Sequence, residues 1–431
     1  MLASGPGKSD RNTNPTVTEI KNPKEDSMSS NHSRKMMGAS LHLSICLLGL
    51  LSLFAIPANA QHVHQLLYNN RNWNDQSLVG EPLYQENNPD VPTGIAAFTT
   101  TPNNEVHVYY VGADGHVHQR TPSQIRFFGV PRWVDEDLTL ETGGDPVAYP
   151  TDLGAFSIDN LQYVFLRNGY DDDVHMLFYN NSTWTDQDIS VAAGSPGACL
   201  NGVIVAFTTT PNNQIHVYYQ GGNFEVRQLF FNGTNWSDEN LSAETGGPPT
   251  QPGYWAGFSI GNYQYLFYVD GESFDLHELF YDNIGWTDID LSAQIGAPKP
   301  GGAGAIAGFV VPGTQTMEVF YTDSGGHIYQ LSSSDNFFWS EQDLTTLTHG
   351  PYDVPGEPLT AFATTPNNQL HVYYISAFAQ SQEHVNQLFF NGSSWSNTDL
   401  TSQTHAGNVR YQAGISGFSL GNYQYVYYGS N

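Results

Sequence analysis

Short hydrophobic runs recur along the chain from about residue 61 to the C-terminus, and turn residues separate them. The clearest unit has runs at 203–207, 215–219, 226–231 and 236–241. They are rich in Val, Ile, Phe and Tyr, and Pro-Asn-Asn, Gly-Gly-Asn and Asn-Gly-Thr divide them. Such runs are typical of β-strands joined by tight turns. No segment has helical periodicity, so we predict an all-β protein.

A tryptophan phrase, Trp-x-Asp or a close variant, marks the fourth run of each unit. Its copies begin at Trp73, Trp133, Trp184, Trp236, Trp286, Trp339 and Trp395. Successive copies are 50 to 60 residues apart. A period near 50 residues with four strands per unit predicts a β-propeller, and the seven copies predict seven four-stranded antiparallel blades.

The two ends of the repeat region are half-units that complement each other. The region opens with a third run (62–68) and a fourth run (73–78), and it ends with a first run (414–420) and a second run (423–428). We therefore predict that one blade is shared between the termini. Pairing of these strands would close the ring and remove two open sheet edges.

The turn between the first and second runs has two types. Thr-Pro-Asn-Asn begins at residues 101, 210 and 365, whereas Ser-Ile-Asp-Asn or Ser-Ile/Leu-Gly-Asn begins at residues 157, 259 and 419. The two types roughly alternate along the chain. This alternation indicates repeated two-blade units.

Residues 1–60 lie outside the repeat. Residues 1–27 are polar, and a basic pair, an apolar run over 41–56 and Ala58-Asn-Ala60 follow Met28. This order is typical of a secretory signal peptide; an uncleaved signal anchor is the alternative. We predict a disordered or mis-assigned leader over 1–27, a signal peptide over 28–60 and the propeller over 61–431. The mature protein would be secreted or periplasmic.

The composition limits the partners. The chain has a formal net charge of −28, with 14 Lys+Arg against 42 Asp+Glu. Such an acidic surface repels nucleic acid and anionic membranes. Cys199 is the only cysteine after residue 60, so the mature chain can form no internal disulfide. The oligomeric state is left open.

Polar residues recur at fixed columns of the second and third strands, beside the Trp column. A hydrogen-bonding pair beside an aromatic ring suits a sugar, whose hydroxyls need donors and acceptors and whose apolar face stacks on a ring. The alternative is that the same residues pack neighbouring blades together. The candidate carbohydrate-binding residues are His107, Gln119, Trp133, His216, Gln228, Trp236, Glu278, Trp286, His371, Gln387 and Trp395.

The unit that contains Ile215–Tyr219, Val226–Phe231 and Asn232–Trp236 resembles a blade of the fungal fucose-specific lectins and of related bacterial propeller lectins. The resemblance extends through short motifs over most of 61–431. In that family an Arg of the second strand, a Glu of the third and a Trp of a neighbouring blade hold the sugar. Here His or Tyr mostly occupies the Arg place, and Gln mostly occupies the Glu place. The resemblance therefore implies a lectin whose specificity for fucose is in doubt.

Three other kinds of motif match patterns that are typical of catalysis or of metal binding. Gly257-Phe-Ser259-Ile-Gly261 and its copy at 417–421 match a nucleophile elbow, but they fall between two predicted strands and not before a helix. His62-Val-His64 and His116-Val-His118 could pair on a metal, but neither has a clear third ligand. Trp286-Thr-Asp288-Ile-Asp290 could hold calcium, but a cap at the exit of the strand is simpler. We expect no catalytic residue, no metal and no cofactor.

The sequence thus predicts an exported, multivalent and non-catalytic propeller that binds neutral glycans or glycoconjugates. Two alternatives stay open. One is a protein–protein interaction scaffold, which would have an apolar face. The other is a propeller glycosidase or lyase, which would have one cleft unlike the others.

Overall fold

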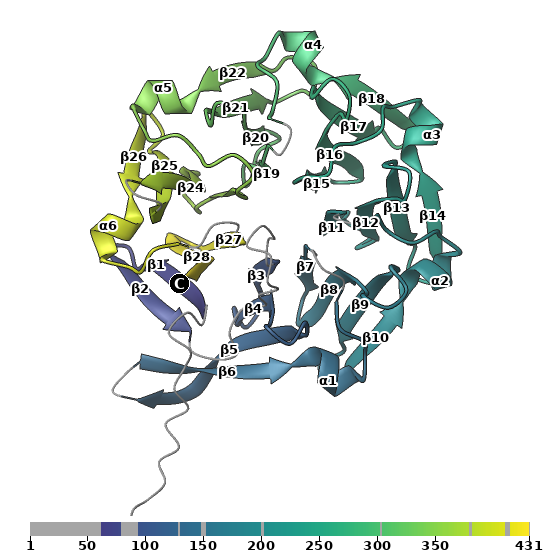
Figure 1. The fold of residues 1–431 in the computed structure, drawn as a ribbon, viewed down its shortest axis with the longest axis horizontal. Helices are drawn as coiled ribbons and strands as arrows, with labels where there is room; N and C mark the ends of the chain where they lie inside the picture. The colour runs from purple at the N-terminus through teal and green to yellow at the C-terminus, as the bar shows by residue number, and fades with distance from the viewer. Residues whose placement is uncertain are drawn as a thin grey trace, which may run out of the picture. The chain divides into compact units, whose positions relative to one another are not determined.

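The computed structural model describes residues 62–78, 94–127, 130–147, 152–199, 202–301, 304–378, 382–409 and 414–430. The predicted leader (1–27) and signal peptide (28–60) lie outside these residues. The described chain forms seven four-stranded antiparallel sheets in a ring (Figure 1), which confirms the seven-bladed propeller.

We number the blades by the order of their Trp phrases and letter the strands a to d from the inside outward. Blade 1 contains β27 (Ile415–Leu420), β28 (Tyr423–Ser430), β1 (His62–Tyr68) and β2 (Trp73–Leu78). Blade 2 contains β3 (Ile95–Thr99), β4 (Val106–Val111), β5 (Val117–Phe127) and β6 (Val130–Asp137). Blade 3 contains β7 (Gly154–Ile158), β8 (Leu161–Arg167), β9 (Val174–Tyr179) and β10 (Trp184–Asp188). Blade 4 contains β11 (Ile204–Thr208), β12 (Ile215–Gln220), β13 (Val226–Phe231) and β14 (Trp236–Asn240).

The remaining three blades follow the same order. Blade 5 contains β15 (Ala256–Ile260), β16 (Tyr263–Val269), β17 (Leu276–Tyr281) and β18 (Trp286–Asp290). Blade 6 contains β19 (Ile306–Val310), β20 (Met317–Thr322), β21 (Ile328–Ser333) and β22 (Ser340–Asp343). Blade 7 contains β23 (Thr360–Ala363), β24 (Leu370–Phe378), β25 (Gln382–Phe390) and β26 (Trp395–Asp399).

Blade 1 closes the ring as predicted. Its strands β1 and β28 come from opposite ends of the repeat region and pair along their whole length, from His62 opposite Ser430 to Tyr68 opposite Gln424. The two outer strands therefore come from the start of the repeat region and the two inner strands from its end. Neither half-unit is left with an unpaired edge at this junction.

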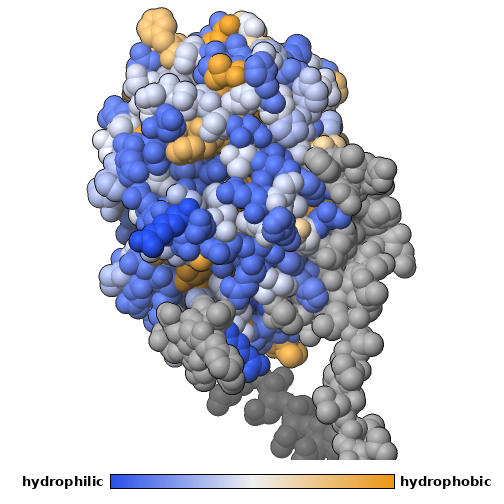
Figure 2. Space-filling view, turned by 90° about the vertical axis from the view of Figure 1, so that its left-hand side faces the viewer, coloured by the Kyte–Doolittle hydropathy of each residue, from blue (hydrophilic) through white to orange (hydrophobic). Residues whose placement is uncertain are grey.

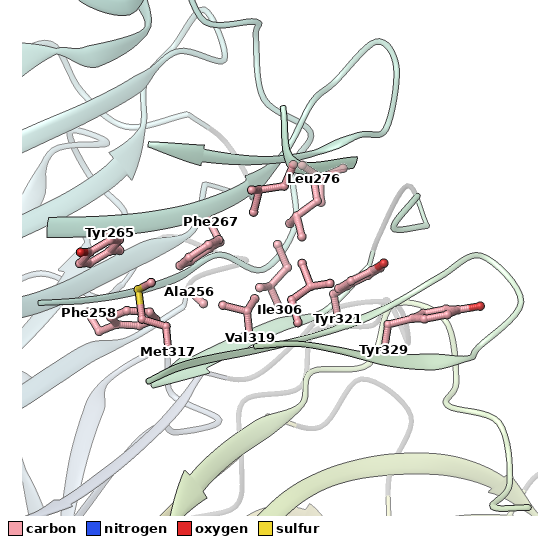
Figure 3. Packing of buried hydrophobic residues seen from close by; sticks show 13 residues of the cluster. Ala256, Phe258, Tyr265, Phe267, Leu276, Ile306, Met317, Val319, Tyr321 and Tyr329 are labelled. Carbon is pink, nitrogen blue, oxygen red and sulfur yellow. The ribbon is translucent and has the colours of Figure 1, made fainter. Parts of the chain in front are cut away.

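The hydrophobic core lies between neighbouring blades, because each sheet packs face to face on the next. Figure 3 shows this for blades 5 and 6, where Phe258 and Phe267 of one blade face Met317 and Val319 of the other. Strands b such as β4, β12 and β20 are buried at every residue. Burial on both faces explains why these strands are continuous hydrophobic runs.

Six single-turn helices follow strand d in blades 2 to 7, a feature that the sequence-based prediction missed. They are α1 (Leu138–Thr142), α2 (Ile189–Ala193), α3 (Leu241–Thr245), α4 (Leu291–Ile295), α5 (Leu344–Thr348) and α6 (Leu400–Thr404). Five residues are too short to show a helical period. No helix in the described part of the chain is long and apolar enough to cross a membrane.

Each of these helices begins with an Asp or Asn cap. In blade 5 the Asp290 carboxylate accepts the backbone N–H of Ala293 at 2.7 Å. The second acid of Trp286-Thr-Asp288-Ile-Asp290 is therefore the predicted cap. The first acid, Asp288, accepts the Tyr268 hydroxyl at 2.7 Å within the same blade.

Candidate functional site

The Trp column packs neighbouring blades together. Most of these indoles stand edge-on against an aromatic ring in strand b of the preceding blade, with centroids 5.9–6.4 Å apart. The pairs are Trp73–Tyr373, Trp133–Tyr427, Trp184–Tyr109, Trp286–Tyr218, Trp339–Phe267 and Trp395–Phe320. Trp236 is buried in the cluster that contains Phe165 of blade 3. Trp133, Trp286 and Trp395 are only half-buried, so part of each indole stays accessible.

The predicted His–Gln pairs form part of a buried network between blades. In blade 4 the Gln228 amide lies 3.0 Å from His216 Nδ1 and donates to the Tyr218 hydroxyl at 2.7 Å. The same amide nitrogen lies 2.9 Å from Gln264 Oε1 of blade 5. Tyr218 also donates to Gln264. One amide therefore connects two strands of its own blade to the next blade.

The network occurs three times. Its members are His107, Tyr109, Gln119 and Gln162 between blades 2 and 3; His216, Tyr218, Gln228 and Gln264 between blades 4 and 5; and His371, Tyr373, Gln387 and Gln424 between blades 7 and 1. We call these three the sealed interfaces. The turns contribute too: the backbone N–H of Thr101, Thr210 and Thr365 bonds a carbonyl in the turn of the following blade. The two turn types thus mark two-blade units.

The three predicted histidines are buried and neutral, and His107 also lines a cleft between blades 1 and 2. Burial lowers the pKa of His107 and His216 to about 4 and that of His371 to about 3. All six His and Gln side chains of the sealed interfaces are at most 6% exposed. Sugar binding by these pairs stays a prediction, but the groups that would bond hydroxyls already bond one another.

Glu278 also lies out of reach of solvent. It occupies the same column as Gln119 and Gln228 but is 0% exposed. Burial raises its pKa to about 8, against a smaller lowering by the Asn336 amide. The carboxyl is therefore mainly protonated at neutral pH, which suits a buried group better than a charged ligand contact.

At two other interfaces, residues of the same columns line a cleft. Between blades 1 and 2, a cleft of about 590 Å³ is lined by Gln65 and Tyr425 of blade 1 and by Trp133 of blade 2. Gln65 donates to Tyr427 at 2.7 Å, and Trp133 Nε1 has no hydrogen-bond partner among the described residues. Thr121–Ser123, on the long β5–β6 hairpin that projects from the ring in Figure 1, form a further wall.

The second cleft lies between blades 6 and 7 and measures about 460 Å³. It is lined by Glu318 and Gln330 of blade 6 and by Trp395 of blade 7. The Glu318 carboxylate accepts the Gln330 amide at 2.8 Å and the Ser332 hydroxyl at 3.1 Å. Burial raises the pKa of Glu318, and these two hydrogen bonds oppose the rise. We call these two junctions the open interfaces.

Two positions together distinguish the two kinds of interface: the strand-b His of a sealed interface is Tyr425 or Glu318 at an open one, and the Gln of the following blade is replaced by an apolar residue. At each sealed interface, strand b of the following blade supplies Gln162, Gln264 or Gln424. At the open interfaces the same position is Val106 or Leu370, which offers no amide to the network. Four residues that line the open clefts were not selected from the sequence: Tyr425, Gln65, Glu318 and Gln330. The alternation of Gln with an apolar residue at the start of strand b was nevertheless visible in the sequence.

The serines of the nucleophile-like motif have a structural role. Ser259 lies within β15, and Ser419 lies within β27; a strand follows each of them. Ser259 donates to the Thr208 carbonyl at 2.7 Å and Ser419 to the Ala363 carbonyl at 2.8 Å, in each case across a sealed interface. A strand-to-helix elbow is absent at both serines, which excludes the nucleophile interpretation for them.

The fold matches solved structures of propeller lectins from fungi and bacteria at low sequence identity. A lectin from Burkholderia pseudomallei matches with a TM-score of 0.53 at 16% identity, over 76% of this chain and 89% of that chain. AofleA from Arthrobotrys oligospora matches with a TM-score of 0.50 at 14% identity, over 85% and 92%. The Aleuria aurantia lectin, described as six-bladed with a novel fucose recognition mode, gives 0.49 at 15% identity, over 71% and 95%. No protein family and no characterised protein matches the sequence itself.

Proposed function

We propose that this protein binds carbohydrate without catalysis at the two open interfaces. One observation carries the proposal: at both junctions, the polar columns of one blade and the Trp of the next line a cleft. Elsewhere, at the sealed interfaces, the same columns are closed by a buried network. A cleft with a few convergent polar groups and one aromatic wall is typical of a small-ligand site.

The chemistry of the clefts suits a neutral sugar. The amides of Gln65 and Gln330 and the carboxylate of Glu318 offer donors and acceptors to hydroxyl groups. The half-buried indoles of Trp133 and Trp395 offer an apolar surface for a sugar ring. The net charge of −28 opposes binding of sulfated or sialylated glycans.

The likeness to propeller lectins supports a lectin and leaves the sugar open. Tyr425 and Glu318 occupy the column position at which the fucose-specific lectins have an Arg. Neither can supply the cationic donor of that position, so the proposal names neutral glycans rather than fucose. Two clefts on one ring would give avidity on a glycan-coated surface. Export, which the signal-like residues 28–60 favour, would bring the protein to such surfaces.

Figure 2 bears on the scaffold alternative. The face that it shows is mainly hydrophilic, with hydrophobic residues in separate spots. A protein-docking face would gather such residues into one patch. Figure 2 views one side of the rim of the ring, and no such patch lies among the described residues on this side.

A glycan array probed with the purified full chain at high density tests the proposal. We expect binding to neutral glycans, lost in the Trp133→Ala/Trp395→Ala double variant. The matched control is Trp286→Ala, which removes an indole at a sealed interface and should keep the binding. Circular dichroism confirms that each variant is folded. Absence of binding to every neutral glycan would contradict the proposal, whereas loss of binding only in Trp286→Ala would move the site to the sealed interfaces.

A further inference from the structure

Two clusters of His and Asp lie in corresponding places of blades 2 and 3. They comprise Asp114, His118 and Asp137 in blade 2, and Asp171, His175 and Asp188 in blade 3. In each cluster, one potential ligand atom of every residue lies within 4.8 Å of the others. The acids come from the turn between strands b and c and from the cap of the helix after strand d. This end of the blade is opposite the end that lines the cleft of blade 2.

In blade 3 the imidazole is held with one nitrogen turned toward the acids. His175 Nδ1 lies 2.9 Å from the Asp186 carboxylate. The other nitrogen, Nε2, is buried, lies 3.6 Å from Asp171 and has no hydrogen-bond partner among the described residues. Asp188 uses one oxygen to cap α2 at Val191 N, 2.7 Å away. A buried ring nitrogen thus lies within 4.8 Å of an oxygen of each of two carboxylates.

Negative charge accumulates around this imidazole. Three carboxylates, those of Asp171, Asp186 and Asp188, lie around the single His175 ring. Such an arrangement is stabilised by a cation at its centre.

Blade 2 has the corresponding residues and a second imidazole, but there both ring nitrogens of His118 already have a carboxylate partner. His118 Nδ1 lies 3.2 Å from Asp135, and its Nε2 lies 3.2 Å from Asp114. His116 Nδ1 lies 2.8 Å from Asp137. The acid beside Nδ1 in each blade, Asp135 or Asp186, belongs to the Trp-x-Asp phrase.

In blade 4 an arginine takes the position that a histidine occupies in blades 2 and 3. Arg227 occupies the place of His175, and its guanidinium binds Asp238, which corresponds to Asp186. The same guanidinium also contacts Glu225 at 3.3 Å. Blade 4 therefore carries a permanent cation where blade 3 carries an imidazole. In blade 2, Arg120 Nε also lies 3.2 Å from Oδ1 of Asp135, an acid outside the three-residue cluster of that blade.

We propose that each cluster binds a divalent transition-metal ion of the zinc type. The ligands are His118 Nε2 with Asp114 and Asp137, and His175 Nε2 with Asp171 and Asp188. One nitrogen and two carboxylates give three protein ligands, the number in open zinc sites, whereas calcium and magnesium prefer all-oxygen sets. Asp135 and Asp186 orient the imidazoles from behind, as outer carboxylates do in zinc proteins. The Trp-x-Asp phrase would thereby support metal binding in these two blades, contrary to the expectation of no metal.

Titration of the full chain with Zn²⁺, after removal of metal by a chelator, tests the proposal. Calorimetry near neutral pH should give two Zn²⁺ per chain. His175→Arg copies blade 4 and should leave one; His118→Arg/His175→Arg should leave none. The matched control is His277→Arg in blade 5, where the ring also bonds an Asp of the Trp phrase but belongs to neither cluster. It should keep two.

A second variant separates ligand geometry from folding. Asp186→Asn keeps an acceptor beside His175 and should weaken one of the two Zn²⁺ sites by about 10- to 100-fold. If both imidazoles are simply protonated ion-pair partners of their acids, the unmodified chain binds no Zn²⁺, and the proposal is overturned. Unchanged stoichiometry in the double His→Arg variant overturns it as well.

Discussion

The interface between blades 4 and 5 and the interface between blades 1 and 2 are built from the same columns and differ at two network positions, where His216 and Gln264 of the first correspond to Tyr425 and Val106 of the second. Gln264 completes a buried network at the first, whereas Val106 occupies that position at the second. The first is closed, and the second retains a cleft of about 590 Å³ beside Trp133. A repeat can therefore keep its packing residues in every blade and offer a ligand site only where a network is incomplete.

The largest effect should come from a tryptophan and should follow the burial of its indole, since Trp286 at a sealed interface is half-buried like Trp133. Trp184 is 7% exposed and packs on Tyr109 across a sealed interface, so Trp184→Ala should lower the free energy of unfolding by about 4 kcal/mol. Trp133→Ala, at an open interface, should cost about half of that because its indole is only half-buried. Chemical denaturation measures both values. Equal losses would show that the two interfaces are packed alike.

The next largest effect is the pH dependence of stability that the buried carboxyl of Glu278 in blade 5 causes. The folded-state pKa of Glu278, about 8, exceeds its usual value of 4.5, so the folded protein keeps a proton that the unfolded chain releases. The stability from this protonated side chain is present at low pH and is lost as pH rises toward 8. Between pH 5 and pH 8 the loss is about 3 kcal/mol, and Glu278→Gln should lack it. Thermal melts across this range measure the difference.

Glu318→Gln provides the comparison at an open interface. Burial raises the pKa of Glu318 as well, but two hydrogen bonds oppose the rise. We therefore expect a smaller change in pH dependence than for Glu278→Gln. A larger change would indicate that Glu318 is shielded from water more strongly than Glu278.

The network itself can be broken at one residue. Gln228→Leu removes the amide that contacts His216 and Gln264 and leaves buried polar atoms unpaired. The free energy of unfolding should fall by about 2 kcal/mol. Gln65→Leu, at an open interface, removes one hydrogen bond to Tyr427 and should cost about 1 kcal/mol. If urea denaturation gives the same cost for both, the network adds nothing beyond its single bonds.

The smallest expected effect is the loss of a helix N-cap, and it should be similar beside sealed and open interfaces. Asn240 caps α3 beside a sealed interface, and Asp343 caps α5 beside an open one. Asn240→Ala and Asp343→Ala should each cost about 1 kcal/mol for the lost cap, because the cap bonds the first turn of its own helix. Asp343→Ala also removes the contact with His327 Nδ1 at 2.9 Å within the same blade. A marked difference between their melting temperatures would mean that the helices help to distinguish the interfaces.

The sequence predicted most of the fold because the repeat expresses local physics. Hydrophobic runs between turn residues gave the strands, the Trp phrase gave the blade count, and the half-units gave the closure through β1 and β28. The single-turn helices escaped notice, since five residues carry no period. The Asp cap of strand d was nevertheless predicted for Asp290 and is confirmed.

The candidate site was harder to predict, because columns in a sequence do not show which neighbour they face. His216 and Gln228 were correctly seen as a hydrogen-bonding pair, but their third partner, Gln264, is 36 residues further along and lies in the next blade. Glu318, Gln330 and Tyr425 belonged to the same columns and were passed over for His. The metal-pair hypothesis for His116 and His118 lacked a third ligand for the same reason: Asp137 approaches only when strands c and d pair.

The sequence by itself determined the all-β class, the seven blades, the shared blade and the alternation of two turn types. These follow from period, turn chemistry and hydrophobic pattern, which act over a few residues. Only the tertiary structure decided which interfaces are sealed, which are open and which acids surround a histidine. Those outcomes depend on hydrogen bonds and burial between segments that are distant in the chain, and a side chain acquires such partners only when neighbouring strands and blades have packed.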